Sequence, residues 1–290
     1  MIRIGRMRWM KLAERIRDAL KHAVVELDED VLASIQTAFE KEQFEAPKAV
    51  LQAILKNLAL AKETGLPMCQ DTGLLLVFAD VGQDCPLSLR EIEASIMEGC
   101  KMAVEQAYFR RSIVEEPVFD RINTQTNLPP VIWWNSVAGS GLQIRILLKG
   151  FGSENCSSVR MLNPTGGKEA IVEAVKQIVK TAGGKPCPPI FVGVGLGGTM
   201  DRAAYLSKRA LLRDVRLSHS DPRYAQLEQD ILAAIQDLGI GSGGLGGSIT
   251  ALHVAIEQES THIAGLPLAV SINCWADRKA VVAWKEGEDA

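Results

Sequence analysis

Apolar residues recur every three or four positions through most of the first 110 residues, and this spacing predicts helices. The first helical stretch is expected over about 11–42, where the repeating positions are Leu12, Ile16, Leu20, Val24, Val31, Ile35 and Phe39. A further helix is expected to begin at Pro47 and to end near Gly65, and another covers about 90–107. The apolar run 74–81 between them has the length of a strand.

Short apolar runs alternate with helical periods in the rest of the chain. Further helices are expected over 168–181, 200–213 and about 222–238. Strands are expected over 131–134, 142–148, 190–194, 249–256 and 268–272, the first two on either side of a glycine turn at 139–141. The alternation predicts a mixed α/β (α+β) fold, a single domain of helices around short sheets with long glycine-rich functional loops.

Composition changes this picture little but excludes some functions. The 290 residues are 47% hydrophobic and 23% charged, with a net charge of -3, and no basic stripe suggests a nucleic-acid partner. Basic residues at the start resemble the first part of a secretion signal, but Glu14, Arg17 and Asp18 interrupt any apolar region after it. No run is long enough to span a bilayer, so we expect a cytoplasmic protein without membrane partners.

The six cysteines are Cys69, Cys85, Cys100, Cys156, Cys187 and Cys274. Disulfides would need an oxidising compartment, and no CxxC pair indicates a local zinc site. The simplest interpretation is six buried thiols. The alternative is that Cys69, Cys187 and Cys274, which lie among turn formers or polar residues, converge to hold three corners of an iron–sulfur cube. Its fourth iron would then be open as a Lewis acid, with Asp71 nearby as a proton carrier.

Two glycine-rich segments allow both structural and functional interpretations. Gly193–Gly198 fits G-x-G-x-x-G after a predicted strand, yet no second strand with an acidic end follows, so a tight turn is the alternative to a dinucleotide site. Gly150–Asn155 is either a surface loop or a loop that binds a carboxylate. The polar stretch from Asn123 to Asn127 is likewise either a turn or a substrate loop.

Taken together, the three cysteine segments resemble the iron–sulfur hydro-lyases, class I fumarases and L-tartrate dehydratases, and most closely the alpha subunit of the two-subunit form. The family's CQDTG, ACPP and C-x-A-x-R segments match Cys69, Cys187 and Cys274, in order, within a similarity from about Lys48 to Trp284. The resemblance implies that these three cysteines bind a [4Fe-4S] cluster. It also implies an N-terminal extension over 1–10 and a hydro-lyase alpha domain over 11–290.

The resemblance extends to five further residues. It implies that Asp71 and His262 are catalytic and that Gln70, Arg110 and Gly152 bind the substrate. Arg110 matches the family's carboxylate-binding arginine better than Arg111 does. Two positions depart from the family pattern, because Phe151 replaces a small residue and Ser248 stands where many relatives carry lysine.

The segment Gly152–Asn155 is closer to fumarase-type alpha chains, so the resemblance favours fumarate hydratase, which converts fumarate and water to (S)-malate. The alternative is the alpha subunit of L(+)-tartrate dehydratase, and a remoter one is a nicotinamide-dependent oxidoreductase. The chain stops near the point where single-chain relatives continue into a second domain. We therefore expect a separate beta subunit as partner in a heterotetramer, and a C4-dicarboxylate substrate.

Overall fold

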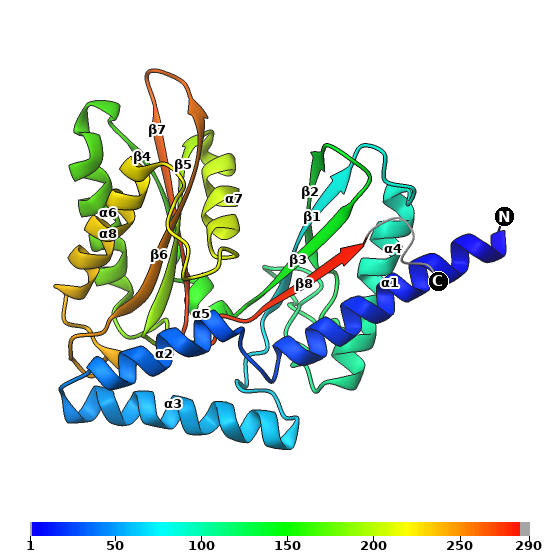
Figure 1. The fold of residues 1–290 in the computed structure, drawn as a ribbon, viewed down its shortest axis with the longest axis horizontal. Helices are drawn as coiled ribbons and strands as arrows, with labels where there is room; N and C mark the ends of the chain where they lie inside the picture. Colours follow the sequence, from blue (N-terminus) through cyan, green and yellow to red (C-terminus); the bar gives the residue numbers. More distant parts are fainter. Residues whose placement is uncertain (1, 285–290) are drawn as a thin grey trace. The chain divides into compact units, whose positions relative to one another are not determined.

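The computed structural model describes the backbone of residues 2–284 and the side chains from Trp9 onward. The chain forms two compact units (Figure 1). The first contains Met1–Leu27, Leu58–Lys149 and Arg278–Ala290, and the second contains Asp28–Asn57 and Gly150–Asp277. One boundary between the units falls inside helix α3 (Glu45–Thr64). Each unit is therefore built from segments that are distant in the sequence.

The first unit is a four-stranded sheet with two helices on one face. The strand order is β2 (Val131–Val137), β1 (Leu74–Gly82), β3 (Leu142–Lys149) and β8 (Lys279–Trp284). Helices α1 (Ile2–Ala23) and α4 (Leu89–Gln106) share one apolar core with the sheet. They approach closely at Gly99, where a Cβ atom would lie 2.7 Å from the Ala13 carbonyl oxygen. This core fixes β1 and thereby the segment that precedes it.

The second unit is a sheet with helices on both faces. Its strands run in the order β4 (Ser158–Leu162), β7 (Leu266–Asn273), β5 (Ile190–Gly198) and β6 (Ala251–Thr261). Helices α6 (Gly167–Ala182) and α8 (Pro222–Gln236) cover one face, and α7 (Met200–Ala210) covers the other (Figure 1). The second unit also contains α2 (Glu29–Lys41), the one-turn helix α5 (Phe151–Glu154) and the 3-10 turns Pro164–Gly166 and Ser242–Gly244.

The expected mixed α/β class is confirmed, with differences in detail. The stretch over 11–42 is two helices, α1 and α2, separated by a break that ends at Asp28 before α2. The strands near 131 and 142 do not pair with each other, because β1 lies between them. The division into an extension over 1–10 and a domain over 11–290 stays a prediction, although α1 runs unbroken through that boundary.

The G-x-G-x-x-G run lies within β5 and not in a turn after it. A Cβ atom on Gly193 would lie 2.0 Å from the carbonyl oxygen of Ser207, and one on Gly195 would lie 2.0 Å from that of Ala203. Both partners belong to α7, so the glycines allow this helix to pack directly against the strand. The run thus has a structural explanation that involves no dinucleotide.

Among the helices of residues 2–284, none has both the length and the apolar character needed to cross a membrane. The cytoplasmic location stays a prediction.

Candidate functional site

The CQDTG segment lies in the first unit and leads directly into β1. Cys69 and Asp71 are half-buried, while Gln70 is exposed. Asp71 closes the turn itself, since its Oδ1 accepts a hydrogen bond of 3.1 Å from the backbone N–H of Gly73. The backbone N–H of Met68 donates to the Val24 carbonyl at 3.1 Å, so the segment is tied to the end of α1 as well as to the sheet.

Gly73 is required by the path of this turn. Its φ is +91°, and a Cβ atom would lie 2.7 Å from the carbonyl carbon of Leu148 and 2.8 Å from the backbone nitrogen of Lys149. Both are backbone atoms of β3, which cannot rotate away as a side chain could. The close approach of the turn to β3 therefore fixes the position of Asp71, which lies just before β1.

Arg110 is held beside this segment by a buried hydroxyl. Thr72 is 1% exposed, and its Oγ1 accepts a 2.9 Å hydrogen bond from the backbone N–H of Arg110. The Arg110 side chain remains exposed. The first unit thus brings together four predicted site residues, namely Cys69, Gln70, Asp71 and Arg110.

The polar stretch around Asn123 and Asn127 supports the same region. Asn127 is buried; its Nδ2 donates to the Gly73 carbonyl at 3.4 Å, and its Oδ1 accepts from the backbone N–H of Ser112 at 3.1 Å. Asn123 donates to the Arg111 carbonyl at 2.8 Å. These bonds give the stretch a supporting role beside the turn. A role as a substrate loop stays a prediction.

Arg278, at the end of the C-x-A-x-R segment, also reaches the turn. Its Nη2 donates a 2.8 Å hydrogen bond to the carbonyl oxygen of Asp71. The motif contains this arginine, but a sequence pattern does not reveal that its side chain would be buried against Asp71. We therefore count Arg278 as a site residue that sequence reasoning missed.

In the second unit, the other two predicted ligands lie on neighbouring segments. The backbone N–H of Trp275, the residue after Cys274, donates to the carbonyl of Cys187 at 3.5 Å. Cys187 has a φ of +56° and is exposed, and Cys274 is half-buried. The carbonyl of Pro188 accepts a 2.7 Å hydrogen bond from Gly243, which ties the glycine-rich run 239–247 to the same turn.

Gly152 lies close to this turn, whereas His262 does not. A Cβ atom on Gly152 would lie 3.9 Å from the Lys185 carbonyl, two residues before Cys187. His262 is exposed in the turn between β6 and β7, and Cys274 follows the opposite end of β7. Eight residues of strand span about 26 Å. The second unit therefore keeps His262 away from Cys274, and its catalytic role stays a prediction.

Two of the remaining cysteines, Cys100 and Cys156, have local environments that give them a structural explanation. Burial raises the pKa of the Cys100 thiol to about 12, so it stays protonated. The Cys156 thiol donates to the Gly152 carbonyl at 3.4 Å. None of the six cysteines forms a disulfide in the described part of the chain. Within residues 2–284 no three His, Cys, Asp or Glu side chains are grouped to hold a metal ion. Because Cys69 belongs to one unit and Cys187 and Cys274 to the other, the three-cysteine set stays a prediction.

Ser248, where many relatives carry lysine, has a clear local role in the second unit. Its backbone N–H and its hydroxyl each donate to the carboxylate of Glu42 at 3.1 Å. Glu42 is fully buried, so these bonds help to satisfy a carboxylate that has no contact with water. This departure from the family pattern therefore fits a structural role.

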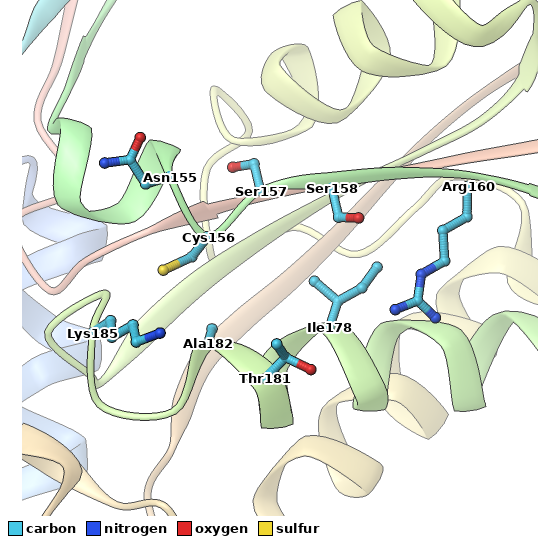
Figure 2. A pocket seen from close by; sticks show the side chains of 9 residues that line it. All are labelled: Asn155, Cys156, Ser157, Ser158, Arg160, Ile178, Thr181, Ala182 and Lys185. Carbon is cyan, nitrogen blue, oxygen red and sulfur yellow. The ribbon is translucent and has the colours of Figure 1, made fainter.

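A polar pocket of about 230 Å³ opens beside the Gly150–Asn155 segment, between β4 and α6. Figure 2 shows Lys185 and Arg160 at opposite ends of it, with Ser158 and Thr181 between them. Two cations with intervening hydroxyl groups suit a small anion with two charged ends. Neither cation was identified from the sequence, since isolated lysine and arginine residues form no motif.

Comparisons with known proteins agree on one family. A family model described as fumarate hydratase (fumerase) matches residues 13–283. The chain is 41% identical over 276 residues to the "Putative L(+)-tartrate dehydratase subunit alpha" of Methanocaldococcus jannaschii, covering 94% of this chain and 97% of that protein. It is 30% identical to the L(+)-tartrate dehydratase subunit alpha of Escherichia coli strain UTI89, covering 94% of this chain and 90% of that protein.

Proposed function

Because the chain belongs to the fumarate hydratase (fumerase) family, we propose that it is the alpha subunit of an iron–sulfur hydro-lyase acting on a C4 dicarboxylate. The observation that carries this proposal is the turn at 69–73, where the Gly73 N–H holds the Asp71 carboxylate and the Thr72 hydroxyl holds the backbone of Arg110. A carboxylate that moves a proton and an arginine that binds a carboxylate are the groups that such a reaction needs.

Dehydration of L(+)-tartrate is the better supported reaction. The relatives at 41% and 30% identity both carry the name L(+)-tartrate dehydratase, and the similarity covers nearly the whole of each chain. Fumarate hydration, which the Gly152–Asn155 segment favoured, remains the second candidate because the family model is described as fumarate hydratase. Both reactions add or remove water across two adjacent carbons of a dicarboxylate, so the same groups serve either substrate.

The donor set fits an iron–sulfur cluster. Cys69, Cys187 and Cys274 lie in loops with partial or full exposure and form no disulfide, whereas Cys100 is a buried thiol whose raised pKa disfavours the thiolate form. Cys69, Cys187 and Cys274 would hold a [4Fe-4S] cluster. When bound, such a cluster with one open iron supplies a Lewis acid that makes the substrate hydroxyl a better leaving group.

The chain's own residues supply the rest of the chemistry. Arg110 would bind a substrate carboxylate through its planar guanidinium, which can donate two parallel hydrogen bonds. Asp71 would accept or pass on the carbon-bound proton through its carboxylate, which the Gly73 N–H holds in place. Gln70 is exposed on the same turn and can donate to the substrate.

A separate beta subunit would complete this site. Both relatives are named as alpha subunits and match this chain along 94% of its length, so we propose that the present chain likewise assembles with a beta subunit. A symmetric heterotetramer is the expected form, because closed two-fold assemblies are the commonest.

The test is a comparison of two substrates with one preparation. The chain is co-expressed with its beta subunit and purified without oxygen, and oxaloacetate formed from L(+)-tartrate is measured alongside (S)-malate formed from fumarate. We expect the tartrate reaction to have the higher kcat/KM. A higher value for fumarate would favour the second candidate. Absence of both activities in an iron-loaded complex would refute the hydro-lyase proposal.

A further inference from the structure

Arg278 is the largest of the fully buried side chains, with a relative exposure of 1%. Within residues 2–284 its side chain makes one hydrogen bond, the 2.8 Å contact from Nη2 to the Asp71 carbonyl. Its Nε and Nη1 are buried without any hydrogen-bond partner among those residues. Two donor nitrogens, which carry three N–H groups, and a positive charge are therefore buried without an acceptor in that part of the chain.

Such an arrangement opposes folding unless something else satisfies it. A guanidinium stays protonated throughout the pH range that proteins tolerate, so proton loss cannot remove the charge. Buried donors without partners are rare in native proteins, and each one calls for an explanation such as an absent ion. Arg145, another arginine of this unit, also has a buried Nε without a partner in the described chain, but its charge is paired with Asp80 at 2.6 Å, whereas the charge of Arg278 has no such partner there.

Arg278 contacts the segment that carries the first predicted cluster cysteine. It reaches the carbonyl of Asp71, two residues after Cys69, and it lies four residues after Cys274 in the sequence. Its own carbonyl accepts a 3.0 Å hydrogen bond from the backbone N–H of Leu148 in β3, and this bond fixes the main chain from which the Arg278 side chain extends. A four-iron cluster with three thiolates has a net negative charge, and its sulfur atoms accept N–H hydrogen bonds.

We propose that Arg278 is a positioning residue of the cluster site: Nη2 fixes the main chain of Asp71, and Nε and Nη1 donate to the sulfur atoms of the cluster and its thiolates. This inference rests on the proposed function. Replacing a residue that hydrogen-bonds to the ligands of a metal site typically lowers metal affinity or activity by about 10- to 100-fold. Arg278, which contacts the turn at Asp71, has both the charge and the unpartnered donors for that role.

The test uses Arg278→Gln and Arg278→Lys in the anaerobic complex with the beta subunit. Either side chain can still donate to the Asp71 carbonyl, but neither has the planar guanidinium that holds further donors at the positions of Nε and Nη1. We expect both variants to lose iron about 10- to 100-fold faster than wild type in the presence of a chelator, as followed by visible absorption. We also expect the iron-free Arg278→Gln protein to melt at the same temperature as wild type or higher, since the variant removes an unpaired buried charge.

Arg145→Gln is the matched control. Arg145 also has a buried Nε without a partner in the described chain, but its guanidinium forms an ion pair with Asp80 and does not contact the turn at 69–73. This variant should melt at a lower temperature and lose iron at the wild-type rate. Wild-type iron retention in both Arg278 variants would overturn the inference, as would a lower melting temperature of iron-free Arg278→Gln without faster iron loss. A wild-type complex that binds no iron would instead refute the proposed function, and the inference with it.

Discussion

Replacing Gly73 with alanine tests whether the close approach of the turn to β3 sets the position of Asp71. The added methyl group would meet the Leu148 carbonyl carbon at 2.7 Å and the Lys149 nitrogen at 2.8 Å. Gly139 offers a matched control in the same unit. It has the same φ of +91°, but a Cβ atom there would meet nothing within 4 Å. The pair separates backbone strain from steric contact.

The two costs can be estimated separately. Alanine at positive φ costs about 1–2 kcal/mol, and this applies to both positions. Forcing an extra methyl group against packed atoms costs a further 1–3 kcal/mol or so, and this applies only to Gly73. The free energy of unfolding should therefore fall by about 1–2 kcal/mol in Gly139→Ala and by about 2–5 kcal/mol in Gly73→Ala.

The assay is urea unfolding of the iron-free chain, followed by circular dichroism, together with kcat of the loaded complex at a temperature where both variants are folded. Because the clash moves the turn that carries Asp71, Gly73→Ala should also lower kcat, by tenfold or more if a displacement of about 1 Å results. Gly139→Ala should leave kcat unchanged. Equal losses of stability and equal kcat in the two variants would refute the reasoning.

Three further predictions concern other parts of the chain. Arg110→Lys keeps the charge but loses the planar guanidinium, so we expect kcat/KM in steady-state assays to fall roughly 5- to 150-fold, which corresponds to about 1–3 kcal/mol of lost transition-state stabilisation. An unchanged kcat/KM would remove Arg110 from the site. Cys187→Ser should abolish iron retention while Cys100→Ser should not, as measured by iron content per chain, and equal iron contents would contradict the ligand set. The backbone N–H groups of Arg121 and its neighbours lower the pKa of Glu116 to about 2, below its usual 4.5. The hydrogen bond from the Arg121 backbone N–H to the Glu116 carboxylate is therefore present above pH 4.5 and lost as the pH falls towards 2. The NMR resonance of the Arg121 amide should titrate with a midpoint near pH 2. A midpoint near pH 4.5 would show that this hydrogen bond does not form.

The local pattern of apolar residues predicted those helices and strands whose side chains are buried in a hydrophobic core. The expected strand at 74–81 is β1, which is a continuous apolar run, and the expected helix over about 90–107 is α4, which has the apolar spacing of one buried face. Strand β4 was missed because it has only five residues, too few to establish a period, and its alternating Val159 and Met161 are exposed. Strand β8 joins β3 from more than a hundred residues away, and local periodicity does not contain that pairing.

The part of the candidate site that is formed by consecutive residues could be predicted from a short sequence motif. Cys69, Gln70 and Asp71 are consecutive, so their proximity needs no tertiary information. Arg278 was not recognised, because burial of a charged side chain leaves no trace in the hydrophobic pattern. His262 shows the opposite problem. Twelve residues from Cys274 is a short distance in sequence, but an extended strand lies between them.

The most direct test of the account is a Mössbauer measurement on the anaerobic complex loaded with ⁵⁷Fe, recorded before and after addition of substrate. Ligation by Cys69, Cys187 and Cys274 leaves one of four irons without a thiolate. The account predicts that substrate changes the signal of that one iron, about a quarter of the total, and leaves the other three unchanged. Four irons that all keep their signals in the presence of a turned-over substrate would contradict it.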